Sequence, residues 1–112
     1  MKPNITALVR EALENSGEIT INDLQALLYQ AKTDAQILRA ARSADTLAAK
    51  KYRESAPLGE KDISSLCRTG INNLLSQFIY EKTKRAKNPW LEINGNVVRL
   101  KATTAAGRNL GP

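Results

Sequence analysis

The sequence contains no histidine and only one cysteine, Cys67, among its 112 residues. The chain therefore lacks the commonest general base and the commonest metal ligand, and it cannot form a disulfide within itself. Its carboxylates are scattered, with no pair or cluster spaced for acid–base catalysis or metal binding. We therefore expect no enzyme, no metal and no other cofactor, and the single cysteine favours a reducing, cytoplasmic location.

Long apolar runs and aromatic residues are also scarce. No run approaches the roughly 20 apolar residues that span a bilayer, so we expect no membrane partner. Aromatic residues make up 4% of the chain, which argues against single-stranded nucleic acid bound by successive stacking. From the chain length we expect one helical domain with a hairpin wing over residues 1–101, followed by a flexible tail over residues 102–112.

Positive charge is abundant and unevenly placed. From Lys82 onward there are seven Lys or Arg residues and one acid, Glu92, whereas the preceding residues are nearly balanced within a net charge of +6. Cations concentrated beside a helix and a hairpin indicate a docking surface for a polyanion. The alternative is a solvated basic run that only keeps the chain soluble.

Hydrophobic spacing of three and four residues predicts four helices. The first follows Asn4, which can cap it, and ends at Gly17, which suits a left-handed C-cap. After a short extended step over residues 18–20, Thr20 and Asp23 form a capping box that opens the second helix. This order of helix, extended link and helix is also how many winged-helix domains begin.

Another capping box, of Thr33 with Gln36, predicts an alanine-rich third helix over residues 34–52. Pro57 marks the loop that follows it. The fourth helix, over residues 60–84, has the strongest apolar stripe, on which Cys67 behaves as a small buried hydrophobe. Gly70 within it allows another element to approach closely, although a helix-turn-helix with its turn at residues 69–71 is an alternative.

Two β-prone runs flank Asn94-Gly95-Asn96 and predict a C-terminal hairpin over residues 90–101. We expect Ile93 and Val97 or Val98 to face the core. Trp90 is expected to plug the core, with base stacking as the alternative.

The polar side of the fourth helix is rich in Asn, Ser and Thr, which form helices less well than the Glu and Lys of an ordinary solvated face. Arg pairs with guanine, and Asn or Gln with adenine, in the major groove. The alternatives are polar packing against another helix or a partner chain, and plain solvent exposure. The predicted base contacts are Arg68, Thr69, Asn72, Asn73, Ser76 and Gln77.

Cations and amides beyond this helix are expected to contact phosphates, which orient a protein on DNA without specifying sequence. The turn of the hairpin would lie near the minor groove or the flanking backbone. The predicted phosphate contacts are Lys82, Lys84, Arg85, Lys87, Asn94, Asn96, Arg99 and Lys101.

The expected architecture is mainly α, with four helices and a C-terminal β-hairpin. Its order of elements over residues 5–101 resembles winged-helix DNA-binding domains. The resemblance implies non-catalytic binding of double-stranded DNA by a small transcriptional regulator or a phage or plasmid accessory protein. We also expect a homodimer, because long striped helices in so short a chain leave apolar surface to bury. Two alternatives stay open: a protein-interaction adaptor or inhibitor whose basic end meets an acidic protein partner, and an RNA-binding protein.

Overall fold

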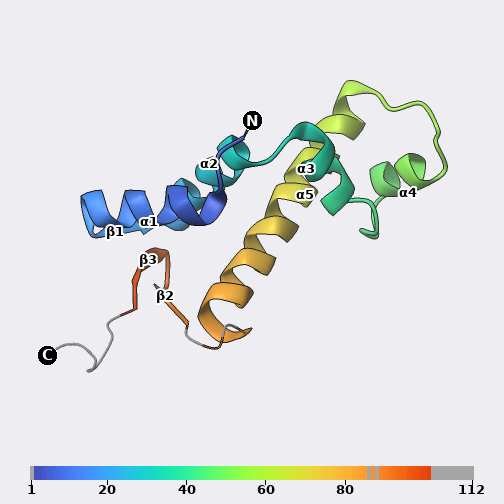
Figure 1. Cartoon of the computed structure of the whole chain (residues 1–112). Coiled ribbons are helices and arrows are strands. Elements are labelled where there is room, and N and C mark those ends of the chain that lie inside the picture. Colours follow the sequence, from blue (N-terminus) through green and yellow to red (C-terminus); the bar gives the residue numbers. More distant parts are fainter. Residues whose placement is uncertain (1, 86, 88, 102–112) are drawn as a thin grey trace, which may run out of the picture.

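The computed structural model describes residues 2–85, 87 and 89–101, and the predicted tail over residues 102–112 lies outside them (Figure 1). Within this range the chain is mainly α, with five α-helices and a three-stranded antiparallel sheet. The elements are α1 (Ile5–Ser16), β1 (Glu18–Thr20), α2 (Ile21–Ala31), α3 (Asp34–Ala40), α4 (Leu47–Arg53), α5 (Glu60–Tyr80), the π-helical turn η1 (Glu81–Arg85), β2 (Leu91–Asn94) and β3 (Val97–Leu100).

The predicted starts of the first three helices are confirmed. They could be predicted because a helix cap depends only on neighbouring residues. The Asn4 side chain accepts hydrogen bonds from two backbone amides of the first turn of α1, at 2.8 and 3.3 Å. Gly17 ends α1 with φ 81°, a left-handed value that favours glycine. The two predicted capping boxes both form, opened by Thr20 in α2 and by Thr33 in α3.

The single helix predicted over residues 34–52 is wrong, because the structure has two short helices, α3 and α4, joined by residues 41–46. Thr46 begins α4 by accepting a hydrogen bond from the Ala49 amide at 3.1 Å. The Arg53 guanidinium donates to two carbonyls near the connection, at 2.7 and 2.9 Å. The break lets two short alanine-rich segments each pack against α5, so five α-helices replace the four predicted.

The fourth predicted helix forms as α5 without a break at Gly70, so the helix-turn-helix alternative is wrong. Its regular part ends at Tyr80, four residues earlier than predicted, and continues as the π-helical turn η1. At this transition the Thr83 hydroxyl donates to the Ile79 carbonyl at 2.6 Å. The Lys82 carbonyl in η1 accepts from the Trp90 amide at 3.2 Å, which ties the turn to the start of the hairpin.

The predicted hairpin is confirmed as β2 and β3, with Gly95 in the turn at φ 64°. The extended step after α1 is strand β1, which pairs with β3 and gives the sheet order β1-β3-β2. In register, Val98 of β3 lies between Ile19 of β1 and Ile93 of β2. Val98 is fully buried, so this row of the sheet faces the core as expected.

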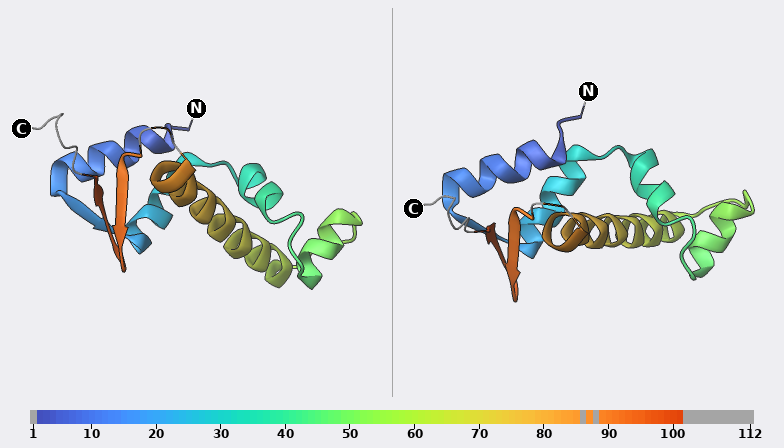
Figure 2. Two further views of the ribbon diagram at one scale, coloured as in Figure 1. Left: turned by 90° about the horizontal axis from the view of Figure 1, so that it is seen from below. Right: turned by 60° about the horizontal axis from the view of Figure 1, so that its bottom comes forward.

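The core lies along α5, which joins the two ends of an elongated molecule (Figure 2). At the hairpin end Phe78 packs with residues of α1, α2 and the sheet, and its ring meets Trp90 edge-on at 6.4 Å. At the α4 end Leu66 packs with three buried alanines. Between them Ile71 packs with Leu28 of α2 and Ile37 of α3. The helical connection over α3 and α4 therefore covers the first half of α5, and the sheet lies beside the second half.

Candidate nucleic-acid interface

The residues predicted to contact bases lie on α5, and all but the half-buried Thr69 are exposed. Two of them also bond to neighbouring helices. The Gln25 side-chain amide of α2 donates to Asn72 Oδ1 at 3.2 Å, and Asn73 Nδ2 donates to the Ala40 carbonyl of α3 at 3.0 Å. Asn72 and Asn73 therefore hold α2 and α3 against α5. This is the polar packing against another helix that the sequence analysis gave as an alternative to base contact. Base contact by the six residues stays a prediction.

Gln77 lies in a groove that contains cations from other elements. The groove has a volume of about 270 Å³ and runs between α3 and α5. Lys32 follows the end of α2, Gln36 and Arg39 belong to α3, and all three line the groove with Gln77. We call these four residues the cationic groove. Two cations and two side-chain amides can contact phosphates and base edges, respectively.

Lys84 and Lys101 line a different groove, of about 330 Å³, between the end of α5 and β2. Ile79 of α5 also lines this groove. Because Ile79 follows Gln77 by two residues, it lies roughly 200° further around the helix axis. Lys84 and Lys101 therefore lie on a different side of α5 from Gln77, and these predicted phosphate contacts do not form one continuous surface with it. Arg85 and Lys87 are exposed near the same end.

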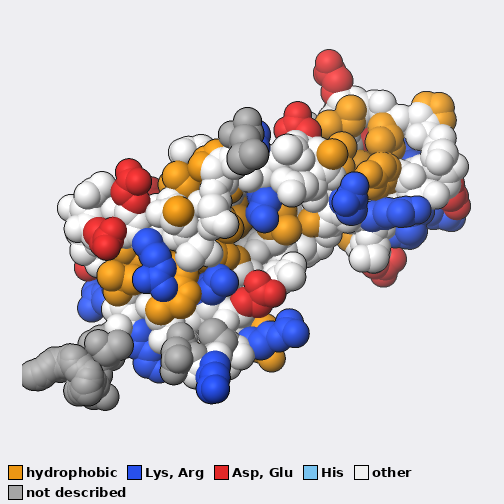
Figure 3. Space-filling model, in the orientation of Figure 1, with side chains coloured by type: hydrophobic (Ala, Val, Ile, Leu, Met, Phe, Trp, Pro, Cys, Tyr) orange, Lys and Arg blue, Asp and Glu red, His pale blue; other side chains and the backbone are white. Residues whose placement is uncertain are grey.

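The surface view agrees with this distribution of charge. Lys and Arg side chains gather around the end that carries η1 and the hairpin, and a second group lies beside α4 (Figure 3). Lys82 differs from Lys84 and Arg85, the other cations of η1, because it is half-buried and its ammonium nitrogen lies 5.7 Å from the centre of the Phe78 ring.

Arg99 lies in the central strand of the sheet between two acids. Its register partners are Glu18 in β1 and Glu92 in β2, so the three side chains share the outer face of the sheet. Arg99 Nη2 lies 3.2 Å from Glu18 Oε1. This pairing gives Arg99 a role in joining β1 to β3, and the outer face of the sheet is not basic at this position.

The hairpin turn is exposed but anchored. Asn94 and Asn96 both present their side chains to solvent. The Asn96 carbonyl accepts a hydrogen bond from the Ile21 amide at 3.1 Å, which ties the turn to the start of α2. A phosphate near the turn would therefore contact a backbone whose position is fixed by this hydrogen bond.

The sequence prediction missed Lys32, Gln36 and Arg39. Lys32 and Arg39 stand far from the C-terminal cluster of cations, and no periodic pattern indicates which part of α5 they approach. One signal was present: Gly70 indicated a close neighbour, and that neighbour is α3, whose Ile37 backbone lies against it.

Asp62 at the start of α5 has a lowered pKa. The Gly59 amide donates to its carboxylate at 3.0 Å and Lys51 Nζ lies 3.2 Å away, so the pKa of Asp62 falls below its ordinary value of 3.8. The carboxylate accepts a hydrogen bond from the backbone amide of the residue that caps α5. Asp62 therefore stabilises the start of this helix.

Comparison with known proteins finds no matching family model, no matching curated protein and no matching solved structure. Among the described residues, no helix has both the length and the apolar character required to cross a bilayer. The same residues contain no group of three or more Cys, Asp or Glu side chains placed to hold a metal ion.

Proposed function

We propose that the chain is a non-catalytic double-stranded DNA-binding protein, a small transcriptional regulator or a phage or plasmid accessory factor. Its elements support a winged-helix-like core. The order α1-β1-α2 is followed, after the α3–α4 segment, by α5 and the β2–β3 hairpin. Strand β1 pairs with the last strand of the hairpin, so the first two helices, α5 and the sheet share one core.

The observation that supports DNA binding best is the cationic groove. Lys32 and Arg39 meet the polar side of α5 at Gln77, so two cations lie beside an amide that can read a base edge. A duplex lying along the second half of α5 would have phosphates against Lys32 and Arg39. Lys84, Arg85, Lys87 and Lys101 lie on the hairpin side, away from Gln77, so they would contact phosphates of the same duplex only where the DNA bends around the end of α5.

The proposed protein partner is a second copy of the chain. Leu47 at the start of α4 is 70% exposed and Ile63 in the first turn of α5 is 43% exposed. Large apolar side chains left in water at one end of the molecule favour burial between subunits. A homodimer would also double the number of DNA contacts.

Fluorescence anisotropy with random-sequence duplex DNA at several salt concentrations tests the function. We expect the logarithm of the binding constant to fall linearly with the logarithm of salt concentration, with a slope near −0.9 per phosphate contacted. Arg39→Ala and Lys84→Ala should each make the slope shallower by about 1. Lys61→Ala, which removes an exposed cation from the first turn of α5, is the matched control and should leave the slope unchanged.

Three results would contradict the proposal. Absence of duplex binding at low salt would favour the adaptor or inhibitor function with an acidic protein partner. Equal or tighter binding of duplex RNA would favour an RNA-binding function. An equal change of slope in Lys61→Ala and Arg39→Ala would mean that binding is not directed to the cationic groove.

A further inference from the structure

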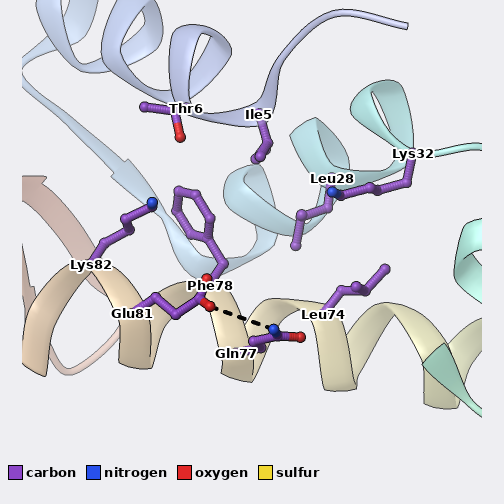
Figure 4. Close-up of a pocket in the computed structure, with 9 residues that line it drawn as sticks. All are labelled: Ile5, Thr6, Leu28, Lys32, Leu74, Gln77, Phe78, Glu81 and Lys82. Carbon is purple, nitrogen blue, oxygen red and sulfur yellow. Dashed lines mark hydrogen bonds between the residues drawn. The ribbon is translucent and has the colours of Figure 1, made fainter. Parts of the chain in front are cut away.

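A second pocket, of about 220 Å³, lies between α1, α2 and the junction of α5 with η1 (Figure 4). It adjoins the cationic groove, with which it shares Lys32, Leu74 and Gln77. Four of the nine residues that line it are apolar: Ile5, Leu28, Leu74 and Phe78. They come from three helices that pack together in the core, so the wall is supported from behind. Drug-sized ligands occupy pockets of roughly 300 Å³ or more, so this volume suits a smaller molecule.

Two ammonium groups belong to the same pocket. Lys32 reaches it from the end of α2 and Lys82 from η1, and Figure 4 shows them on opposite sides with apolar side chains between them. Both lysines are half-buried, and neither forms an ion pair with any residue that the structure describes. A partly desolvated cation without an anionic partner favours binding of an anion.

The acid in the pocket has a partner of its own. Glu81 Oε2 accepts a hydrogen bond from Gln77 Nε2 at 3.5 Å, along one side of the pocket (Figure 4). With two lysines and one glutamate, the lining keeps a net positive charge. Lys82 also belongs to a π-helical turn, a rare geometry that is frequent at functional sites.

We propose that this pocket binds a small organic carboxylate with an aromatic or branched apolar body. The carboxylate pairs with Lys82, and the apolar body lies against Ile5, Leu74 and Phe78. Inorganic phosphate would pair with the lysines but leave the exposed parts of Ile5 and Leu74 in water, and a neutral apolar molecule would leave the ammonium groups without an anion. The inference goes beyond DNA binding and does not depend on it.

The test uses the protein alone, so its result is independent of DNA binding. Isotope-labelled protein is titrated separately with benzoate, acetate and benzyl alcohol, and amide chemical shifts are followed by NMR. We expect saturable 1:1 binding of benzoate with a Kd at or below about 1 mM, in the range of a fragment-sized ligand. Acetate has the charge without the ring, and benzyl alcohol has the ring without the charge. Each should bind at least about tenfold more weakly, and the benzoate shifts should centre on Thr6, Gln77 and Lys82.

Variants assign the binding to the pocket. Lys82→Gln should weaken benzoate about tenfold without unfolding the protein, because the backbone carbonyl that anchors η1 remains. Leu74→Phe should abolish binding by filling the pocket. Lys61→Gln is the matched control on the exposed first turn of α5 and should bind benzoate as the parent chain does.

The proposal is overturned if benzoate shows no saturation by 10 mM, or if acetate or inorganic phosphate binds as tightly as benzoate. It is also overturned if Lys82→Gln and Lys61→Gln bind benzoate equally. If Leu74→Phe fails to fold, the comparison of those two lysine variants still decides the outcome.

Discussion

Gly70 of α5 lies directly against the backbone carbonyl of Ile37 in α3. A Cβ at position 70 would overlap the Ile37 carbonyl oxygen, and the carbonyl carbon would lie 2.9 Å from it. Both atoms belong to a backbone that cannot move without shifting the whole of α3. The lack of a side chain at Gly70 therefore sets how closely the two helices approach, and with it the width of the cationic groove.

Gly70→Ala should destabilise the fold. Alanine favours a helix over glycine by about 1 kcal/mol, but forcing α3 away from α5 costs more, so we expect a net loss of about 1–3 kcal/mol in the free energy of unfolding. Chemical denaturation measures this loss. Ser76→Ala, on the exposed side of the same helix, should be neutral or slightly stabilising. A Gly70→Ala protein as stable as the parent would contradict the close contact.

Asp62 should make stability depend on acid pH. Its pKa is lowered first by the Gly59 amide and then by Lys51, so folding favours the ionised carboxylate. The stabilisation is complete above the ordinary pKa of 3.8 and is lost as the pH falls through the lower pKa of the folded state. Asp62→Asn should therefore lose less stability than the parent between about pH 5 and pH 2.

Denaturant unfolding at a series of pH values checks this prediction. Lys51→Met should retain part of the pH dependence, because the Gly59 amide still favours the ionised carboxylate. Identical pH profiles for the parent and Asp62→Asn would contradict it.

Arg99→Gln should affect the sheet more than DNA binding. Arg99 pairs with Glu18 and faces Glu92. Both members of the Arg99–Glu18 ion pair are substantially exposed, so the loss of stability should be small, about 0.2–1 kcal/mol. Because Arg99 is already paired, the salt dependence of duplex binding should not change. Thermal unfolding and anisotropy titrations measure the two effects. A slope shallower by about 1 would instead assign Arg99 to a phosphate contact.

Leu47→Glu should convert the proposed homodimer into a monomer. A carboxylate in place of the exposed Leu47 would have to be buried without a partner when the subunits meet. Light scattering after size-exclusion chromatography gives the mass of each variant. Tyr29→Glu, at another exposed apolar site on α2, is the control and should remain a dimer. A parent chain that is monomeric at micromolar concentration would rule out the homodimer.

The predicted and observed structures agree best where a structure depends on a few adjacent residues. The Asn94-Gly95 turn and the capping box that opens α3 are both local, and both formed as predicted. The break between α3 and α4 was missed because it depends on tertiary packing. Thr46 begins a new helix where α3 and α4 each pack separately against α5. Alanine-rich spacing is compatible with one helix or two, and packing decided between them.

The candidate site also has a part that the sequence predicted and a part that it did not. Sequence alone identified the polar side of α5, because amide and hydroxyl side chains are unusual on a solvated helix. It did not show that Asn72 and Asn73 bond to α2 and α3, or that Lys82 turns into a pocket beside Phe78. Those contacts join residues that are distant in the chain, and no local pattern encodes the partner.

The amino-acid order by itself determined where the helices begin, which side of each is apolar, where the hairpin turns, and that the C-terminal third is basic. Only tertiary structure decided that β1 joins the hairpin, that Arg99 is held between acids, and that Lys32 and Arg39 meet Gln77. The physical reason is range: caps and turns satisfy backbone groups within a few residues, whereas burial and charge pairing depend on which distant segments pack together.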